Sequence, residues 1–306
     1  MKEDSIHGVL KISNHHLYRM EEKAKIVCSY FQNSKPFFIG RNGSTELEIL
    51  NYYYKTKNKN IPQQLCNRIE LYSGIFPATP ESVYKWIEIY FESLYSVDAI
   101  AEGWYEPLKE FENKFLDKII SQRESLFLRN LEPYYFPKEL RWTKYLKGKR
   151  VGIINPFSEL CETQTYMAKA IWGEYNCEFL LPLSTSWIPI RTYFPPSIAG
   201  KNLEMAWKCK DWEEAVESLV QKAVSEQIEV ALIGCGAIGM IVGARLKALG
   251  ISVIVMGGAL QILFGVRGKR WENHSVISKF FNDAWINVSD DLKPTGAYKI
   301  ENACYW

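Results

Sequence analysis

A glycine-rich turn between two apolar runs constrains the fold of this chain more than any other feature. The first run, residues 230–233, leads into the turn GCGAIG at 234–239, and the second run, 253–256, ends in the glycine pair 257–258. Two short apolar runs joined by a helix-length segment predict a βαβ unit. Glycines in its first turn let backbone N–H groups and a helix N-terminus approach an anion closely. The pattern therefore indicates a phosphate-binding turn, without indicating which ligand carries the phosphate.

Three interpretations of this turn stay open at this level. In dinucleotide-binding folds, an Asp or Glu about 20 residues past the glycines binds the ribose hydroxyls. Here the second run ends in Met256 and two glycines without an acid, and the charged residues that follow are basic. This departure disfavours NAD(P) or FAD. The other interpretations are a turn that only packs a helix against a strand and a nucleotide-sugar site, which we favour.

The composition is that of an ordinary globular protein, and it disfavours several classes. The 306 residues are 47% hydrophobic and 24% charged, and the net charge of +2 argues against a dedicated nucleic-acid-binding protein. The cysteines are scattered without a Cys-x-x-Cys pair, which is typical of free thiols in a reducing compartment. The N-terminus lacks an apolar signal sequence, and the uncharged run 248–266 is interrupted by glycines, so we interpret it as buried strands rather than a transmembrane segment. We expect a cytoplasmic protein, either free or peripheral to the membrane.

Helical and strand patterns divide the chain into two halves. In the first half, apolar residues at helical spacing predict helices over 17–31, 83–94 and 108–119, with a short strand at 36–40. In the second half, strands at 151–154 and 179–181 alternate with helices at 159–172 and 211–225. The alternation predicts an α/β, Rossmann-like fold, with a largely parallel sheet, helices on both faces and a helix-rich N-terminal half. We divide the chain into 1–147 and a nucleotide-binding half, 148–306, which can also form one continuous domain.

Polar or glycine-rich turns follow every predicted strand. They occupy residues 41–46, 155–158, 182–186, 234–236 and 257–258. The carboxyl ends of parallel strands meet at one edge of a sheet, where open α/β folds bind ligands. Turns of this composition also arise because helices need N-caps. We favour the interpretation in which the turns share one ligand site.

The turn after the first strand carries the sharpest candidates for chemistry. Arg41, together with Glu46 and Glu48, can bind a phosphate, hold a metal ion or abstract a proton. An equally good interpretation makes Ser44 a helix N-cap, with Glu46 favoured by the helix dipole. The two interpretations stay open on local sequence.

Two further groups of charged residues are candidates. Asp98 lies four residues before Glu102 in a predicted helix, so the two carboxylates would share a face and could act as acid and base, although such pairs are more often solvated. Arg267, Lys269 and Arg270 could neutralise a diphosphate or form a basic surface loop, and we favour the former.

Together these motifs resemble the GT-D-type glycosyltransferases. The shared features are Arg-x-Gly-x-x-Glu at 41–46, Leu-x-Gly-Lys-x-Val-x-Ile at 146–153, and LIGCGAIG…GGALQILFGVRGKRW at 232–271. The similarity extends from Phe37 to Trp306 and is greatest to a bacterial and viral branch of that fold found among surface-polysaccharide genes.

The resemblance implies a glycosyltransferase that moves a sugar from a nucleoside-diphosphate donor, with a UDP-sugar favoured, to a glycan or lipid-linked acceptor in surface-polysaccharide synthesis. In the related enzymes the turn reads Arg-x-Gly-Asp-Gly-Glu, and its acids contact the metal and the donor diphosphate. Arg41, Gly43 and Glu46 match, whereas Ser44 stands at the Asp position and Thr45 at the second Gly. Serine is a poor ligand for a hard cation. Mn²⁺ or Mg²⁺ is therefore left open as a cofactor, with Glu46 as its candidate ligand.

On this basis we assign catalytic roles to Arg41, Glu46 and Asp98, with the two acids as alternative bases. Donor binding is assigned to the strand-end turns and the basic cluster, namely Ser44, Ser158, Ser184, Gly234, Gly236, Gly239, Gly258, Gln261, Arg267, Lys269 and Arg270. The competing functions are an NAD(P)-dependent oxidoreductase and a non-catalytic nucleotide-binding subunit of a glycan pathway. The oligomeric state is left open.

Overall fold

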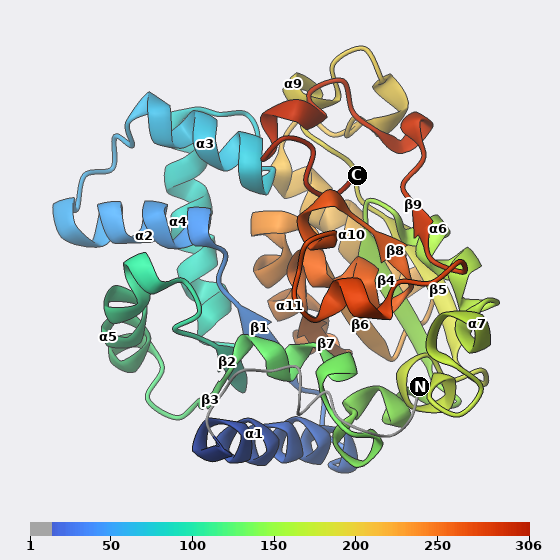
Figure 1. Ribbon diagram of the computed structural model, residues 1–306. Coiled ribbons are helices and arrows are strands. Elements are labelled where there is room, and N and C mark those ends of the chain that lie inside the picture. The colour runs from blue at the N-terminus through green and yellow to red at the C-terminus, as the bar shows by residue number, and fades with distance from the viewer. Residues whose placement is uncertain (1–13) are drawn as a thin grey trace.

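A seven-stranded parallel sheet organises the computed structural model, which describes residues 14–306 (Figure 1). The strand order is β3-β2-β1-β7-β6-β4-β5, and every neighbouring pair is parallel. The strands are β1 Phe38–Arg41, β2 Ala99–Ala101, β3 Glu124–Leu126, β4 Arg150–Asn155, β5 Ser186–Arg191, β6 Val230–Ile233 and β7 Ser252–Val255. A separate parallel pair consists of β8 Val266–Arg267 and β9 Ile286–Asn287.

Helices cover both faces of this sheet, as the alternation of the sequence predicts. Successive strand residues point to opposite faces, so Phe38 packs into one hydrophobic core and Ile39 into the other. The Phe38 face is covered by α2 Ser44–Thr56, α3 Gln63–Ser73, α4 Pro80–Leu94, α5 Lys109–Ile119, α10 Trp212–Ser225 and α11 Gly239–Ala248. The Ile39 face is covered by α1 Asn14–Gln32, α6 Ser158–Thr165, α7 Ala168–Trp172, α8 Cys177–Leu180 and α12 Leu260–Leu263. The short helix α9 Pro196–Ala199 packs beside residues 294–296.

The sheet runs continuously through both halves of the chain. Strands β1 to β3 come from residues 1–147 and β4 to β7 from 148–306, and the two sets join where Phe38 pairs with Val253. The α/β, Rossmann-like fold is therefore confirmed. The uncharged run 248–266 forms the end of α11, β7, α12 and the start of β8. Within residues 14–306, no helix is long and apolar enough to cross a membrane.

The prediction of a strand at 179–181 is wrong. Those residues end the short helix α8, whose apolar side chains pack beside the helical turn at 142–146, and the strand of this region is β5, which begins at Ser186. β5 contains Pro189, which reads as a strand breaker in the sequence. It is tolerated because β5 is an edge strand that pairs only with β4.

Two helical predictions also need correction. Residues 99–101, between Asp98 and Glu102, form β2 rather than a helix, so the two carboxylates flank a buried strand instead of sharing a helix face. A buried strand of three small or branched residues has no periodicity long enough to detect. The helix expected over 159–172 is interrupted at 166–167 and forms α6 and α7.

Candidate functional site

A cavity of about 410 Å³ opens at the carboxyl edge of the sheet. The turns that follow β1, β4, β6 and β7 line it, with residues from 41–46, 155–157, 234–236 and 257–258. Four of the five predicted turns therefore line one cavity, and their role in binding a ligand stays a prediction. The predicted turn at 182–186 precedes β5 and lies at the amino edge, and the turn that does follow β5, residues 192–195, lines the cavity instead. A volume of this size suits a small-molecule ligand.

Arg41 is the last residue of β1 and lies in the cavity wall. Its guanidinium packs over the indole of Trp104, 4.6 Å from the ring centroid, and lies against the turn after β7, where a Cβ on Gly257 would be 2.6 Å from Arg41 Nη1. Its Nε and Nη2 donate only long hydrogen bonds of 3.4 Å to the Asn42 carbonyl. Within residues 14–306, no carboxylate forms an ion pair with it. Arg41 thus keeps donors for an anion that enters the cavity.

Asn42 holds this turn in place through buried hydrogen bonds. It was not among the site residues predicted from the sequence. The side chain is fully buried; its Nδ2 donates to Glu112 Oε1 at 2.9 Å and its Oδ1 accepts from Tyr90 OH at 2.7 Å. The backbone carbonyl of Asn42 accepts from Trp104 Nε1 at 2.9 Å. Glu112 Oε2 in turn accepts from the backbone N–H of Gly103 at 2.8 Å. This network therefore connects α4 and α5 to the indole on which Arg41 packs.

Glu46 lies in the first turn of α2 with its carboxyl folded toward the start of the helix. A Cβ on Gly43 would collide with this carboxyl, so the glycine is required for the arrangement. Burial raises the pKa of Glu46, although its own backbone N–H, the charge of Arg41 and the Ser73 hydroxyl oppose the shift. A buried carboxyl with a raised pKa beside a cation has the environment of a proton acceptor. Glu48, by contrast, pairs with Arg68 at 2.7 Å and does not line the cavity.

The glycines of the strand-end turns are required by packing within the chain. Gly236 has φ +68°, and a Cβ there would collide with the carbonyl oxygen of Ser73 at the end of α3. A Cβ on Gly234 would lie 2.6 Å from the Gly257 carbonyl oxygen, and one on Gly258 would collide with the Tyr305 ring. Gly236 is thus required by packing against α3, because protein atoms occupy the space of a Cβ, and its predicted role in phosphate binding stays a prediction.

Gly239 lies outside the cavity. It begins α11, where a Cβ would meet the Ile233 side chain at 3.3 Å, so its place is at the contact between helix and strand. The backbone of 234–236 and 257–258 still lines the cavity. The first N–H groups of the helical turns that start there have no acceptor within the helix, so they can bind a ligand.

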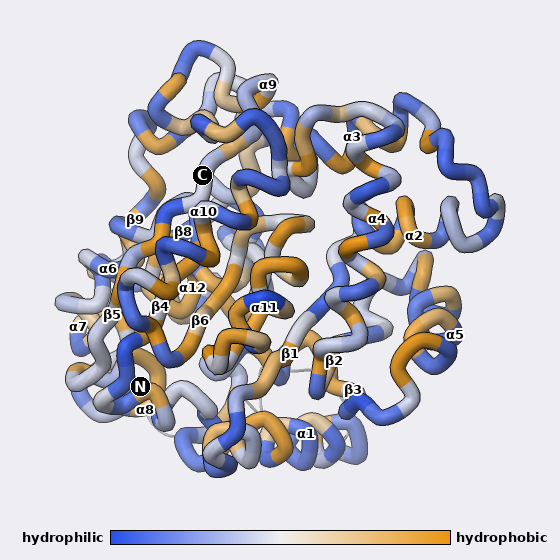
Figure 2. Tube along the Cα trace, turned by 180° about the vertical axis from the view of Figure 1, so that it is seen from behind, coloured by the Kyte–Doolittle hydropathy of each residue, from blue (hydrophilic) through white to orange (hydrophobic). Residues whose placement is uncertain are grey.

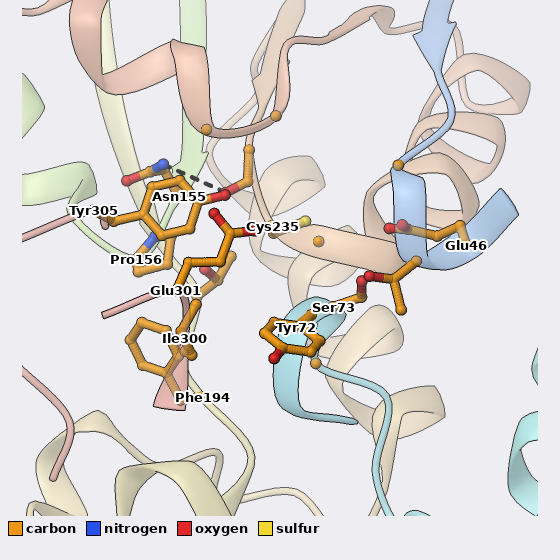
Figure 3. Close-up of a pocket in the computed structure, with 18 of the residues that line it drawn as sticks. Glu46, Tyr72, Ser73, Asn155, Pro156, Phe194, Cys235, Ile300, Glu301 and Tyr305 are labelled. Atoms are coloured by element: carbon orange, nitrogen blue, oxygen red, sulfur yellow. Dashed lines mark hydrogen bonds between the residues drawn. The ribbon is translucent and has the colours of Figure 1, made fainter. Parts of the chain in front are cut away.

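The C-terminal segment 300–306 forms the wall opposite α2. Figure 3 shows Glu301 and Tyr305 on one side of the cavity and Glu46 and Ser73 on the other. Arg270 lines this wall; it pairs with the carboxylate of Glu301 and donates to Tyr305 OH at 3.1 Å. The segment is held by the hydrogen bond from Gln261 Nε2 to the Tyr305 carbonyl, 3.2 Å.

The basic cluster predicted at 267–270 is divided by the structure. Arg270 and Gln261 line the cavity, as expected for donor-binding residues. Arg267 instead donates to the Asn282 carbonyl at 2.6 Å and packs over Phe281, and Lys269 is exposed outside the cavity. The three cations therefore do not act together at one anion.

Three other candidates lie away from the cavity. Asp98 is at the amino end of β2, where it accepts from the Phe38 backbone N–H at 2.7 Å and pairs with Lys247 at 2.8 Å. Ser184 precedes β5 at the same edge, and Ser158 is buried at the start of α6. Asp98 is thus at the wrong edge to accept a proton from a ligand in the cavity, whereas Ser44 does line it.

The structure adds residues that the sequence analysis missed. An aromatic wall is contributed by distant segments, with Tyr72, Trp104, Tyr105, Tyr193, Phe194 and Trp306. Glu132, which follows β3, is buried within electrostatic range of Arg41. Burial raises the pKa of Glu132 to about 7. The high aromatic content of the sequence was the one signal for this wall. Composition does not indicate which aromatic residues line the cavity.

The cavity residues give little support for a resident metal ion. Within residues 14–306, no group of three or more His, Cys, Asp or Glu side chains is arranged to hold one. Glu46 would supply one protein carboxylate, and its raised pKa reflects an environment that disfavours the charged form a cation needs. We therefore derive no step through a metal.

Comparison of the chain with protein-family models, with curated proteins and with solved structures finds no match in any of the three. The cavity and its residues are therefore the basis for assigning a function.

Proposed function

We propose that this protein is a glycosyltransferase that uses a nucleoside-diphosphate sugar, with a UDP-sugar favoured, and transfers the sugar to a glycan or lipid-linked acceptor in surface-polysaccharide synthesis. The observation that carries the proposal is Arg41, a partly buried cation without a carboxylate partner in the described residues, set at the carboxyl edge of a parallel sheet beside a buried acid, Glu46. The sequence motifs that resemble GT-D-type enzymes include both residues.

In the proposed reaction, Arg41 binds the donor diphosphate. As the bond between the anomeric carbon and the diphosphate oxygen breaks, negative charge develops on the leaving group, and a guanidinium already in place stabilises that charge. The backbone N–H groups of the turns at 234–236 and 257–258 supply further donors. The acceptor hydroxyl attacks the anomeric carbon, and Glu46 takes its proton. The aromatic wall provides surfaces on which a base or a sugar ring can pack.

The competing oxidoreductase is disfavoured by two features of the βαβ unit formed by β6, α11 and β7. β7 ends in Val255 and runs into Met256 and two glycines, so no acid stands where a dinucleotide ribose would be bound. The Cβ side of Gly236 is filled by the Ser73 carbonyl rather than open to a ligand. Neither feature favours NAD(P).

A thermal-shift panel tests the proposal. UDP-, GDP-, CMP- and dTDP-sugars are compared with NADH and NADPH, because a ligand that binds the folded state raises its melting temperature. We expect a shift with one nucleotide sugar and none with NAD(P)H, and loss of that shift in Arg41→Ala. A shift with NADH and with no nucleoside diphosphate would overturn the proposal.

The stabilising donor is then assayed for release of nucleoside diphosphate, with EDTA and with added Mn²⁺. We expect turnover that survives the chelator, and turnover that falls about 100-fold in Glu46→Gln. Activity lost with EDTA and restored by Mn²⁺ would instead make Glu46 a metal ligand. Tight binding without turnover on any glycan or lipid-linked acceptor would favour the non-catalytic subunit.

A further inference from the structure

The loop that joins α2 to α3 forms an outer margin of the molecule, away from the cavity. α2 begins at the cavity with Ser44 and leads outward, and the loop at its far end is hydrophilic and lies at the edge of the molecule in both views (Figures 1 and 2). Every residue from 55 to 60 is exposed. The segment reads YYYKTKNKN at 52–60, a pattern of tyrosines and alternating lysines that the proposed reaction does not use.

Lysines and tyrosines from the loop, α2, α4 and α5 gather at this margin. We call them the Lys–Tyr patch, and its members are Tyr53, Tyr54, Lys55, Lys57, Lys59, Tyr84 and Lys118. Three of the four lysines lie over rings: Lys57 is 4.4 Å from the Tyr54 centroid, Lys59 is 5.1 Å from that of Tyr84, and Lys118 is 5.5 Å from that of Tyr54. Tyr53 and Tyr84 are 5.7 Å apart, so the rings are continuous across α2 and α4.

The lysines of the patch carry charge that the described residues do not neutralise. None of them forms an ion pair within residues 14–306, whereas Lys85, Lys109 and Lys114 on the same helical layer are all paired with glutamates. Two acids on the neighbouring helices are engaged by other groups. Glu88 accepts from Tyr84 OH at 2.6 Å, and Asp117 pairs with Arg123 at 3.2 Å.

We propose that the Lys–Tyr patch docks this protein on an anionic lipid bilayer. Unpaired lysines near a membrane surface are attracted by acidic headgroups, and tyrosines suit the interface because an apolar ring carries a polar tip. The ammonium groups of Lys57 and Lys59 lie over tyrosine rings and are not paired with carboxylates of the described residues, so their charge is available to acidic headgroups.

The shape of the patch favours a bilayer over a polyanionic chain. Proteins track nucleic-acid and other anionic chains in grooves, with free aromatic faces on which bases stack. Here the residues lie on a projecting margin, and the ring faces of Tyr54 and Tyr84 are already covered by lysine ammonium groups.

Vesicle co-sedimentation of the full chain tests the docking. The probes are phosphatidylcholine vesicles and vesicles of phosphatidylcholine mixed with phosphatidylglycerol. We expect binding only to the mixed vesicles, weakened by added salt, with each lysine contributing about fivefold to the partition coefficient. The variant K55Q/K57Q/K59Q/K118Q should therefore lose measurable binding. Circular dichroism confirms that it folds.

The matched control is K35Q/K201Q/K279Q/K299Q, which removes the same charge from four exposed lysines outside the patch that also form no ion pair among residues 14–306. This control should bind as the unmodified protein does. Equal loss in both variants would show that general charge, and not the patch, governs binding. Failure of the unmodified protein to bind the mixed vesicles would overturn the proposal, as would patch-dependent binding to heparin or single-stranded DNA without binding to vesicles.

Discussion

The two arginines that line the cavity are held in opposite ways. Arg41, on the sheet side, packs over Trp104 and makes only long hydrogen bonds to its own neighbour. Arg270, on the C-terminal side, is already paired with Glu301 and bonded to Tyr305. Both are cations at one cavity. Within the described residues, Arg270 has a carboxylate partner and Arg41 has none.

The difference shows that position in a cavity does not by itself make a cation an anion-binding group. An anion gains most from donors that are rigidly held and not yet used, because no existing interaction has to be broken. Arg41 meets this condition through its aromatic platform and the Asn42 network. Arg270 would have to exchange Glu301 for the ligand, so its net contribution is smaller.

Removing each arginine in turn tests this comparison most directly. We expect Arg41→Ala to lower the affinity for the stabilising nucleoside diphosphate about 100-fold, and Arg270→Ala to lower it only a few-fold, because one charge-assisted contact is lost in the first case and exchanged in the second. Isothermal titration calorimetry measures both. Equal losses would remove the distinction between the two sides of the cavity.

A second buried acid, Glu132, lies within electrostatic range of Arg41 and should make the stability of this side depend on pH. Burial raises the pKa of Glu132 to about 7 from 4.5, so the stability that protonation contributes is complete below 4.5 and is lost as the pH rises through 7. Glu132→Gln, which is neutral throughout, should therefore gain about 3 kcal/mol of unfolding free energy relative to the native chain over that interval. Urea denaturation across this pH range measures the gain. A difference that does not change with pH would show that Glu132 is not the titrating group.

We expect the hydrogen-bond network of Asn42 to affect nucleoside-diphosphate affinity only through the position of Arg41. Asn42→Asp places a second carboxylate within hydrogen-bond reach of Glu112, and this repulsion should disturb the turn and lower nucleoside-diphosphate affinity about tenfold. Glu112→Gln added to that variant restores a donor–acceptor pair with the roles reversed, so affinity should recover. Calorimetry on the single and double variants gives the coupling. If the double variant is no better than Asn42→Asp, Asn42 does not act through Glu112.

The smallest effect is expected on the Arg270 side. Glu301→Gln removes the carboxylate that competes for Arg270, so nucleoside-diphosphate affinity should rise a few-fold. The matched control is Glu272→Gln, an exposed glutamate near Arg270 in sequence that does not line the cavity, which should leave affinity unchanged. Weaker binding by Glu301→Gln would mean that this carboxylate contacts the ligand itself.

Local patterns were sufficient for much of the fold. The amphipathic spacing of α1, α4, α5 and α10 and the apolar runs of β1, β4, β6 and β7 are confirmed, because each is long or apolar enough to be read without its neighbours. The missed strands depended on context. β2 is short and buried between β1 and β3, and β5 tolerates Pro189 only as an edge strand.

The sequence by itself determined that strand-end turns would meet at one edge, because parallel strands align their carboxyl ends whatever the details of packing. It also named Arg41, Ser44, Glu46, Gln261 and Arg270, which line the cavity, and Asp98, Ser158 and Ser184, which do not. Only the tertiary structure decided which of those residues are free to act. Asn42 donates a hydrogen bond to Glu112, Gly236 packs against the Ser73 carbonyl, and Arg270 pairs with Glu301. The physical reason is that burial and charge pairing depend on contacts between segments far apart in the chain, and no local pattern records them.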